Sequence, residues 1–137
     1  MVRIDLTYQG DLRCEATHVP SGTTLHTDAP VDNHGKGESF SPTDLVATAL
    51  GACMGTILGI VAERHEVDLS GMRISVIKSM ATEPVRRIGK LQTVIHIPAD
   101  PGEDLRKTFE RAALTCPVHR SLGEQVELPV LFRWGKA

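Results

Sequence analysis

The chain has 137 residues, enough for one hydrophobic core, and its 15 Lys and Arg against 17 Asp and Glu give a formal net charge of −2. This balance argues against a nucleic-acid binder or a polybasic membrane-surface protein, and 4% aromatic residues leave few platforms for stacking bases. Three cysteines without CxxC spacing, and no apolar signal segment at the N-terminus, favour a cytoplasmic protein with free thiols.

The first 40 residues predict three short strands and a loop. The strands are expected at Val2–Tyr8, Asp11–His18 and Thr23–Thr27. Gln9-Gly10 and Ser21-Gly22 supply the turns between them. Residues 28–39 are rich in Asp, Pro, Asn and Gly, and predict a loop of the kind that often borders a site.

A long helix follows the loop. Ser41 is a good N-cap, Pro42 suits the first helical position, and Asp44 completes a capping box. We expect the helix to run to residue 64 or 65. Its stretch 45–62 carries no charge and reaches the lower length limit of a membrane span, but small residues dilute its hydrophobicity, so a buried central helix is the better interpretation.

Three glycines, Gly51, Gly55 and Gly59, form a ridge of small residues on this helix. Such a ridge lets another backbone approach closely. We expect the neighbour to be a second buried helix or the concave face of a sheet.

The second half of the chain predicts three more strands and two helices. The strands are expected at Met72–Met80, Lys90–Ile97 and Val126–Trp134, with Leu91, Thr93, Ile95 and Ile97 along one face of the second. Pro101-Gly102 starts a helix whose apolar stripe is Leu105, Phe109, Ala112 and Cys116. Pro117 ends that helix and starts a shorter one that reaches about Leu122. The predicted fold class is α+β with a mostly antiparallel sheet, in one domain over residues 1–137.

Two cysteines occupy settings that suit different halves of a thiol redox cycle. Cys116 lies at a helix junction, where free N–H groups stabilise a thiolate and can lower the pKa of the thiol. Cys53 lies mid-helix among apolar residues, and needs a cation or a hydrogen-bond donor near its sulfur in order to react. The cations that could serve are Arg13, Lys36, Arg86, Arg87 and Arg120. Taken singly, each cysteine is also explained as a small apolar core residue.

The third cysteine and the histidines point to no other chemistry. Cys14 is expected to be a packing residue on a strand. The six histidines show no HxH or HExxH spacing, and no phosphate-binding glycine motif occurs, so we expect neither a metal nor a cofactor. His119 stands one helical turn from Cys116, where it could support a thiolate or be a solvated surface residue.

The motif Ser41-Pro42-Thr43-Asp44-Leu45, followed by Cys53 and by the distant Cys116-Pro117-Val118, resembles the OsmC/Ohr superfamily of osmotically inducible and organic-hydroperoxide-resistance proteins. The resemblance covers nearly the whole chain. It implies an intertwined homodimer in which sheets shared between the chains wrap long central helices. It also implies that Cys53 attacks an organic hydroperoxide, that Cys116 then forms a disulfide with it, and that an external dithiol of the lipoyl type restores both thiols.

The sequence departs from the peroxidase pattern near the reactive cysteine. The peroxidases carry a glutamate ten residues before that cysteine and an arginine in the preceding loop. Here Thr43 takes the place of the glutamate, with Asp44 beside it, and the loop has no arginine, although Arg13 is a potential substitute. Because both cysteines are present, we expect a thiol-dependent peroxidase. The missing glutamate favours two alternatives: a non-catalytic dimer that binds a small apolar ligand in the interface cleft, and a redox sensor without turnover.

Overall fold

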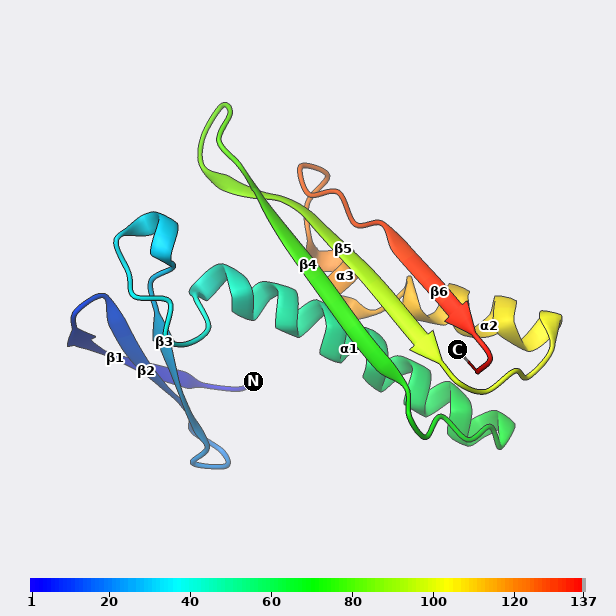
Figure 1. Ribbon diagram of the computed structural model, residues 1–137. Coiled ribbons are helices and arrows are strands. Elements are labelled where there is room, and N and C mark those ends of the chain that lie inside the picture. Colours follow the sequence, from blue (N-terminus) through cyan, green and yellow to red (C-terminus); the bar gives the residue numbers. More distant parts are fainter. Residues whose placement is uncertain (137) are drawn as a thin grey trace. The chain divides into compact units, whose positions relative to one another are not determined.

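The computed structural model describes residues 1–136, which form two compact units that divide after residue 46. Each unit contains one three-stranded sheet (Figure 1). The observed order of strands and helices is the predicted one: three strands, a long helix, two strands, two helices and a strand. The α+β class is thereby confirmed.

The first unit is an antiparallel meander of β1 (Ile4–Gly10), β2 (Arg13–His18) and β3 (Thr24–Asp28). Its first turn differs from the prediction. Strand β1 continues through Gly10, and the chain reverses at Asp11 and Leu12, which both have positive φ angles of 53° and 61°. Tight hairpins need this left-handed conformation at their central residues, so the turn lies two residues later than Gln9-Gly10 suggested.

One face of this meander is apolar and exposed in the single chain. Ile4, Leu6 and Tyr8 alternate along β1, and the side chains of Leu6 and Tyr8 are 64% and 65% exposed. Leu6 pairs with Ala16 on β2, which pairs in turn with Leu25 on β3, so that the apolar face crosses all three strands.

Helix α1 (Pro42–His65) starts where the capping box predicts. The Asp44 N–H donates to Ser41 Oγ at 3.1 Å, and the Ser41 N–H donates to Asp44 Oδ2 at 2.9 Å, which is the reciprocal pattern of such a box. The loop before the helix contains one short 3-10 turn, η1 (Val31–Asn33).

The second unit contains β4 (Arg73–Ala81), β5 (Arg87–Ile97) and β6 (Val130–Trp134), in the order β4-β5-β6. Strands β4 and β5 are antiparallel, whereas β6 runs parallel to β5. The parallel pair is possible because two helices carry the chain back across the sheet. Leu91, Thr93, Ile95 and Ile97 are all fully buried, which confirms the predicted inner face of β5.

Helices α2 (Glu103–Ala113) and α3 (Pro117–Ser121) form the connection between β5 and β6. Helix α2 ends three residues before Cys116, earlier than predicted, and its buried stripe contains Ala113 in place of Ala112. The buried Phe109 meets Trp134 of β6 edge to face, with ring centroids 5.7 Å apart. Strand β6 is also shorter than predicted, since only Glu127, in an isolated bridge to Lys90, pairs before Val130.

The glycine ridge of α1 packs against a sheet, one of the two predicted neighbours. A Cβ atom added at Gly51 would lie 3.0 Å from Val76 Cγ2, and one at Gly55 would lie 3.0 Å from Ile74 Cδ1, both on β4. A Cβ at Gly59 would meet nothing within 4 Å. By length and composition α1 is apolar enough to cross a membrane, and only 33% of its most apolar window is buried in the single chain.

Candidate dithiol site

Cys53 and Cys116, which are 63 positions apart in the sequence, interact in the second unit through their side chains. Cys53 comes from α1 and is half-buried, whereas Cys116 is fully buried. Both are free thiols in this structure, as is Cys14. The fold therefore forms the pair that the sequence suggested, with one cysteine more exposed than the other.

The local sequence around Cys116 explains its position. Pro117 forces the preceding residue out of the helical region, and Cys116 is extended, with φ −61° and ψ 144°. Its sulfur then caps α3 by accepting the His119 N–H at 3.3 Å. Cys116 is thus the N-cap of α3 as well as a member of the dithiol.

The pKa of the Cys116 thiol lies above its ordinary value, and burial is the main cause. The N–H groups of His119 and Val118 act in the opposite direction, and the interaction with Cys53 raises the pKa further. The expectation that the helix junction would lower this pKa is wrong, because removing the sulfur from water outweighs two N–H groups of a short helix. Cys116 is therefore a thiol, not a thiolate, at neutral pH.

Arg13, the proposed substitute for the missing arginine, binds two carboxylates of the first unit. Its Nη2 donates to Glu38 Oε2 at 2.6 Å and to Asp28 Oδ2 at 3.4 Å. The hydrogen bond to Glu38 is the first cause that raises the pKa of Arg13, and the charge of Asp28 is the second. Support of the Cys53 thiolate by Arg13, or by any of the other four cations, stays a prediction.

Asp28 and Glu38 were not identified as partners of Arg13 from the sequence. Asp28 is only 2% exposed, and its Oδ2 also accepts the Glu38 N–H at 3.0 Å. The one sequence signal was the position of Asp28, at the start of a loop rich in polar and turn residues.

Thr43 and Asp44 lie in the first turn of α1. Asp44 is engaged as the capping carboxylate described above, and Thr43 Oγ1 lies 3.2 Å from Ser41 Oγ. His119 reaches Cys116 through its main-chain N–H, while its side chain is half-buried. Cys14 pairs with Tyr8 and Thr27 across the first sheet and is half-buried, and its role as a packing residue stays a prediction.

Comparisons with known proteins agree on one family. The family model for OsmC-like proteins matches residues 35–130. A solved structure of a candidate osmotic stress induced and detoxification response protein from Psychrobacter arcticus is 45% identical, with 96% of each chain covered and a TM-score of 0.90. No curated protein matches the sequence.

More distant solved structures share the fold. An OsmC-like protein from Mycoplasma pneumoniae is 16% identical over 98% of this chain and 97% of its own, with a TM-score of 0.82. An organic hydroperoxide resistance protein from Legionella pneumophila is 15% identical over 97% and 96%, with a TM-score of 0.77.

Proposed function

The chain belongs to the OsmC-like protein family, and we propose that it is a cytoplasmic thiol-dependent peroxidase that reduces organic hydroperoxides with Cys53 and Cys116. The observation that carries the proposal is the interaction of a half-buried thiol with a fully buried one. Several proteins of the same fold are named organic hydroperoxide resistance proteins, which favours this substrate class.

In the first step, Cys53 is the attacking residue because it is the more exposed of the two cysteines. The Cys53 thiolate attacks the distal oxygen of the hydroperoxide, an S–O bond forms, and the O–O bond breaks. The alkoxide leaves and takes up a proton to become the alcohol. Cys53 remains as a sulfenic acid, oxidised by two electrons.

In the second step, Cys116 resolves the sulfenic acid. Its sulfur loses a proton and attacks the Cys53 sulfur, an S–S bond forms, and the hydroxyl leaves as water. Burial keeps Cys116 protonated until then, so it does not compete for the hydroperoxide. An external dithiol, lipoyl-type in the resemblance, would reduce the disulfide by two exchange steps and become a disulfide itself.

The proposed assembly is a homodimer, as is typical of the family. Two features of the single chain support it: the exposed apolar face of β1, with Leu6 and Tyr8, and the largely unburied apolar surface of α1. Exposed apolar areas of this kind mark protein–protein or membrane contacts. Light scattering tests the proposal, and a monomer at micromolar concentration would overturn it.

The chemistry is tested by intact mass spectrometry of reduced protein after one equivalent of cumene hydroperoxide. The wild type should lose two hydrogens, Cys116→Ser should gain one oxygen, and Cys53→Ser should not change. An unchanged wild-type mass would sink the peroxidase proposal, and a gain of oxygen in Cys53→Ser would reverse the two roles.

A redox sensor that forms the same disulfide without turnover is the second proposal. It is favoured by Thr43 in place of the glutamate and by the engagement of Arg13 with Glu38. Multiple turnovers of cumene hydroperoxide with dihydrolipoamide would support the enzyme. Disulfide formation that stops after one equivalent would support the sensor.

A further inference from the structure

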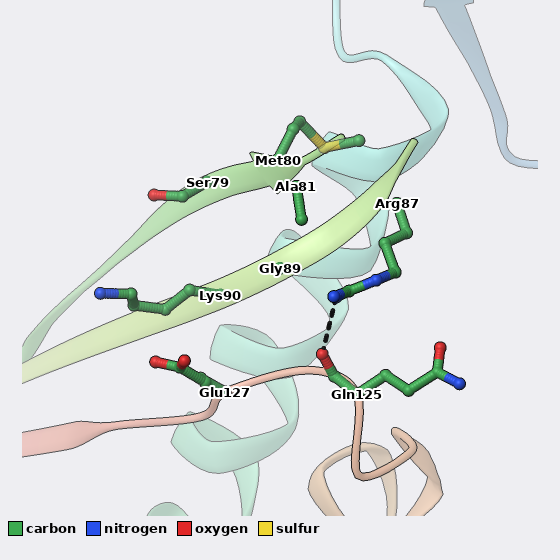
Figure 2. A pocket seen from close by; sticks show the side chains of 8 residues that line it. All are labelled: Ser79, Met80, Ala81, Arg87, Gly89, Lys90, Gln125 and Glu127. Atoms are coloured by element: carbon green, nitrogen blue, oxygen red, sulfur yellow. Dashed lines mark hydrogen bonds between the residues drawn. The ribbon is translucent and has the colours of Figure 1, made fainter. Parts of the chain in front are cut away.

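A small cavity of about 250 Å³ lies in the second unit, at an irregularity in the β4–β5 hairpin (Figure 2). Ser79 pairs with Lys90 and Met80 with Ile88, so Gly89 is an extra, unpaired residue on β5. A Cβ atom at Gly89 would lie 3.0 Å from Ala81 Cβ, and the glycine therefore leaves bare backbone in the wall of the cavity.

Two opposite charges stand side by side at this cavity. The Glu127 N–H donates to Gly89 O and the Leu91 N–H donates to Glu127 O, both at 2.9 Å, so Glu127 is bridge-paired with Lys90. Paired residues of neighbouring strands project their side chains from the same face. Figure 2 shows both side chains extending in one direction, yet among the described residues no ion pair joins them.

Arg87 holds together the part of the cavity wall that contains Gln125. Its Nη1 donates to Gln125 O at 2.9 Å and to Ile88 O at 3.4 Å, and its Nη2 donates to Glu83 O at 3.4 Å. These bonds connect the hairpin to the segment before β6, as the dashed line in Figure 2 shows for Gln125. The cavity is thus held by the Arg87 side chain, which donates to main-chain carbonyls, and by the main-chain bonds of Glu127, so it does not need a ligand in order to form.

We propose that this cavity binds a small zwitterion of the α-amino-acid type, with its carboxylate on Lys90 and its ammonium on Glu127. A lone anion would meet the carboxylate of Glu127, and a lone cation would meet Lys90 and Arg87. A zwitterion satisfies both signs at once, and the Ser79 hydroxyl, which Figure 2 shows on the same side as the heads of Lys90 and Glu127, adds a hydrogen-bonding group. The volume lies below the roughly 300–1,000 Å³ of drug-sized sites, which favours a ligand with few heavy atoms.

The experiment is a titration of the full-length, ¹⁵N-labelled protein with glycine, followed by amide chemical shifts. We expect saturable shifts at Ser79, Gly89 and Lys90, and shifts at least about tenfold weaker with acetate or methylammonium, which each lack one charge. Lys90→Gln and Glu127→Gln should each abolish the glycine shifts. Lys107→Gln, which removes an exposed ion pair to Glu103 on α2, is the matched control and should bind as the wild type does.

Three results would overturn the proposal: no saturable shift at these amides, equal shifts with acetate, or glycine binding that survives both substitutions. The amide spectrum of each variant reports whether it is folded. Should one variant unfold, the other and the two single-charge probes still decide. Because the cysteines take no part in this titration, its outcome is independent of the peroxidase proposal.

Discussion

The raised pKa of Cys116 leads to a quantitative prediction for the resolving step, the conversion of the Cys53 sulfenic acid to the disulfide. This step requires the Cys116 thiolate. Burial, the main cause of the raised pKa, persists after Cys53 is oxidised, although the charge of Cys53 does not. The prediction is therefore tested by following a single turnover of the wild type at a series of pH values.

The magnitude follows from the fraction of thiolate. For a free thiol with a pKa of about 8.5, that fraction rises about 25-fold between about pH 7 and about pH 9. A thiol with a higher pKa gives a larger rise in the thiolate fraction, up to a limit of about 100-fold over the same two pH units, because each pH unit below the pKa changes that fraction tenfold. We expect the rate of the resolving step to rise by more than the free-thiol factor.

The assay is rapid acid quench after one equivalent of cumene hydroperoxide, with intact mass spectrometry of the sulfenic acid and the disulfide at each time point. Cys116→Ser is the control, because its sulfenic acid should persist at every pH. A wild-type rate that rises by about 25-fold or less between about pH 7 and about pH 9 would refute the reasoning, since it would show that the buried thiol ionises as readily as a free one.

Three further predictions concern the second unit, with stability measured by urea unfolding at fixed protein concentration. Thr93→Val should leave stability unchanged or raise it by up to about 1 kcal/mol, because the fully buried Thr93 Oγ1 has no partner among the described residues; a loss above that size would reveal a bond to the hydroxyl. Trp134→Phe should cost at least about 1 kcal/mol more than Glu110→Gln, since it removes the 3.0 Å bond from Trp134 Nε1 to Glu110 Oε1 and part of the ring that packs against Phe109, whereas glutamine keeps an acceptor; equal losses would contradict this. Hydrogen bonds from the Arg106 side chain, and then from the Gly102 N–H, hold the pKa of Asp100 below its usual range. The stability that ionised Asp100 contributes to the fold is therefore present above the unfolded pKa of about 3.9, and it is lost as the pH falls through the folded pKa. Asp100→Asn should therefore lose less stability than the wild type between about pH 5 and about pH 2, and parallel acid curves would exclude the effect.

Local signals in the sequence determined where most elements begin. Ser41, Pro42 and Asp44 predict the start of α1 because capping involves groups only three residues apart. Pro117 predicts the break before α3 because a proline restricts its immediate neighbour. The buried face of β5 follows from a period of two, which is a property of the strand itself. Errors occurred at the ends of elements, as at the first turn and at the start of β6, where pairing with the neighbouring strand decides the boundary.

Contacts between distant residues were decided by the tertiary structure alone. The sequence suggested Cys53 and Cys116 as a pair through a family resemblance, but the packing of the second unit is what brings the two side chains into interaction. The direction of the Cys116 pKa likewise depends on how completely the fold removes the sulfur from water, which its neighbours in sequence do not set. The tertiary structure also decided two further contacts between distant residues: the binding of Arg13 to Glu38 and the parallel pairing of β6 with β5. Local chemistry limits each segment to a few conformations, whereas burial and pairing depend on which segments the whole chain brings together.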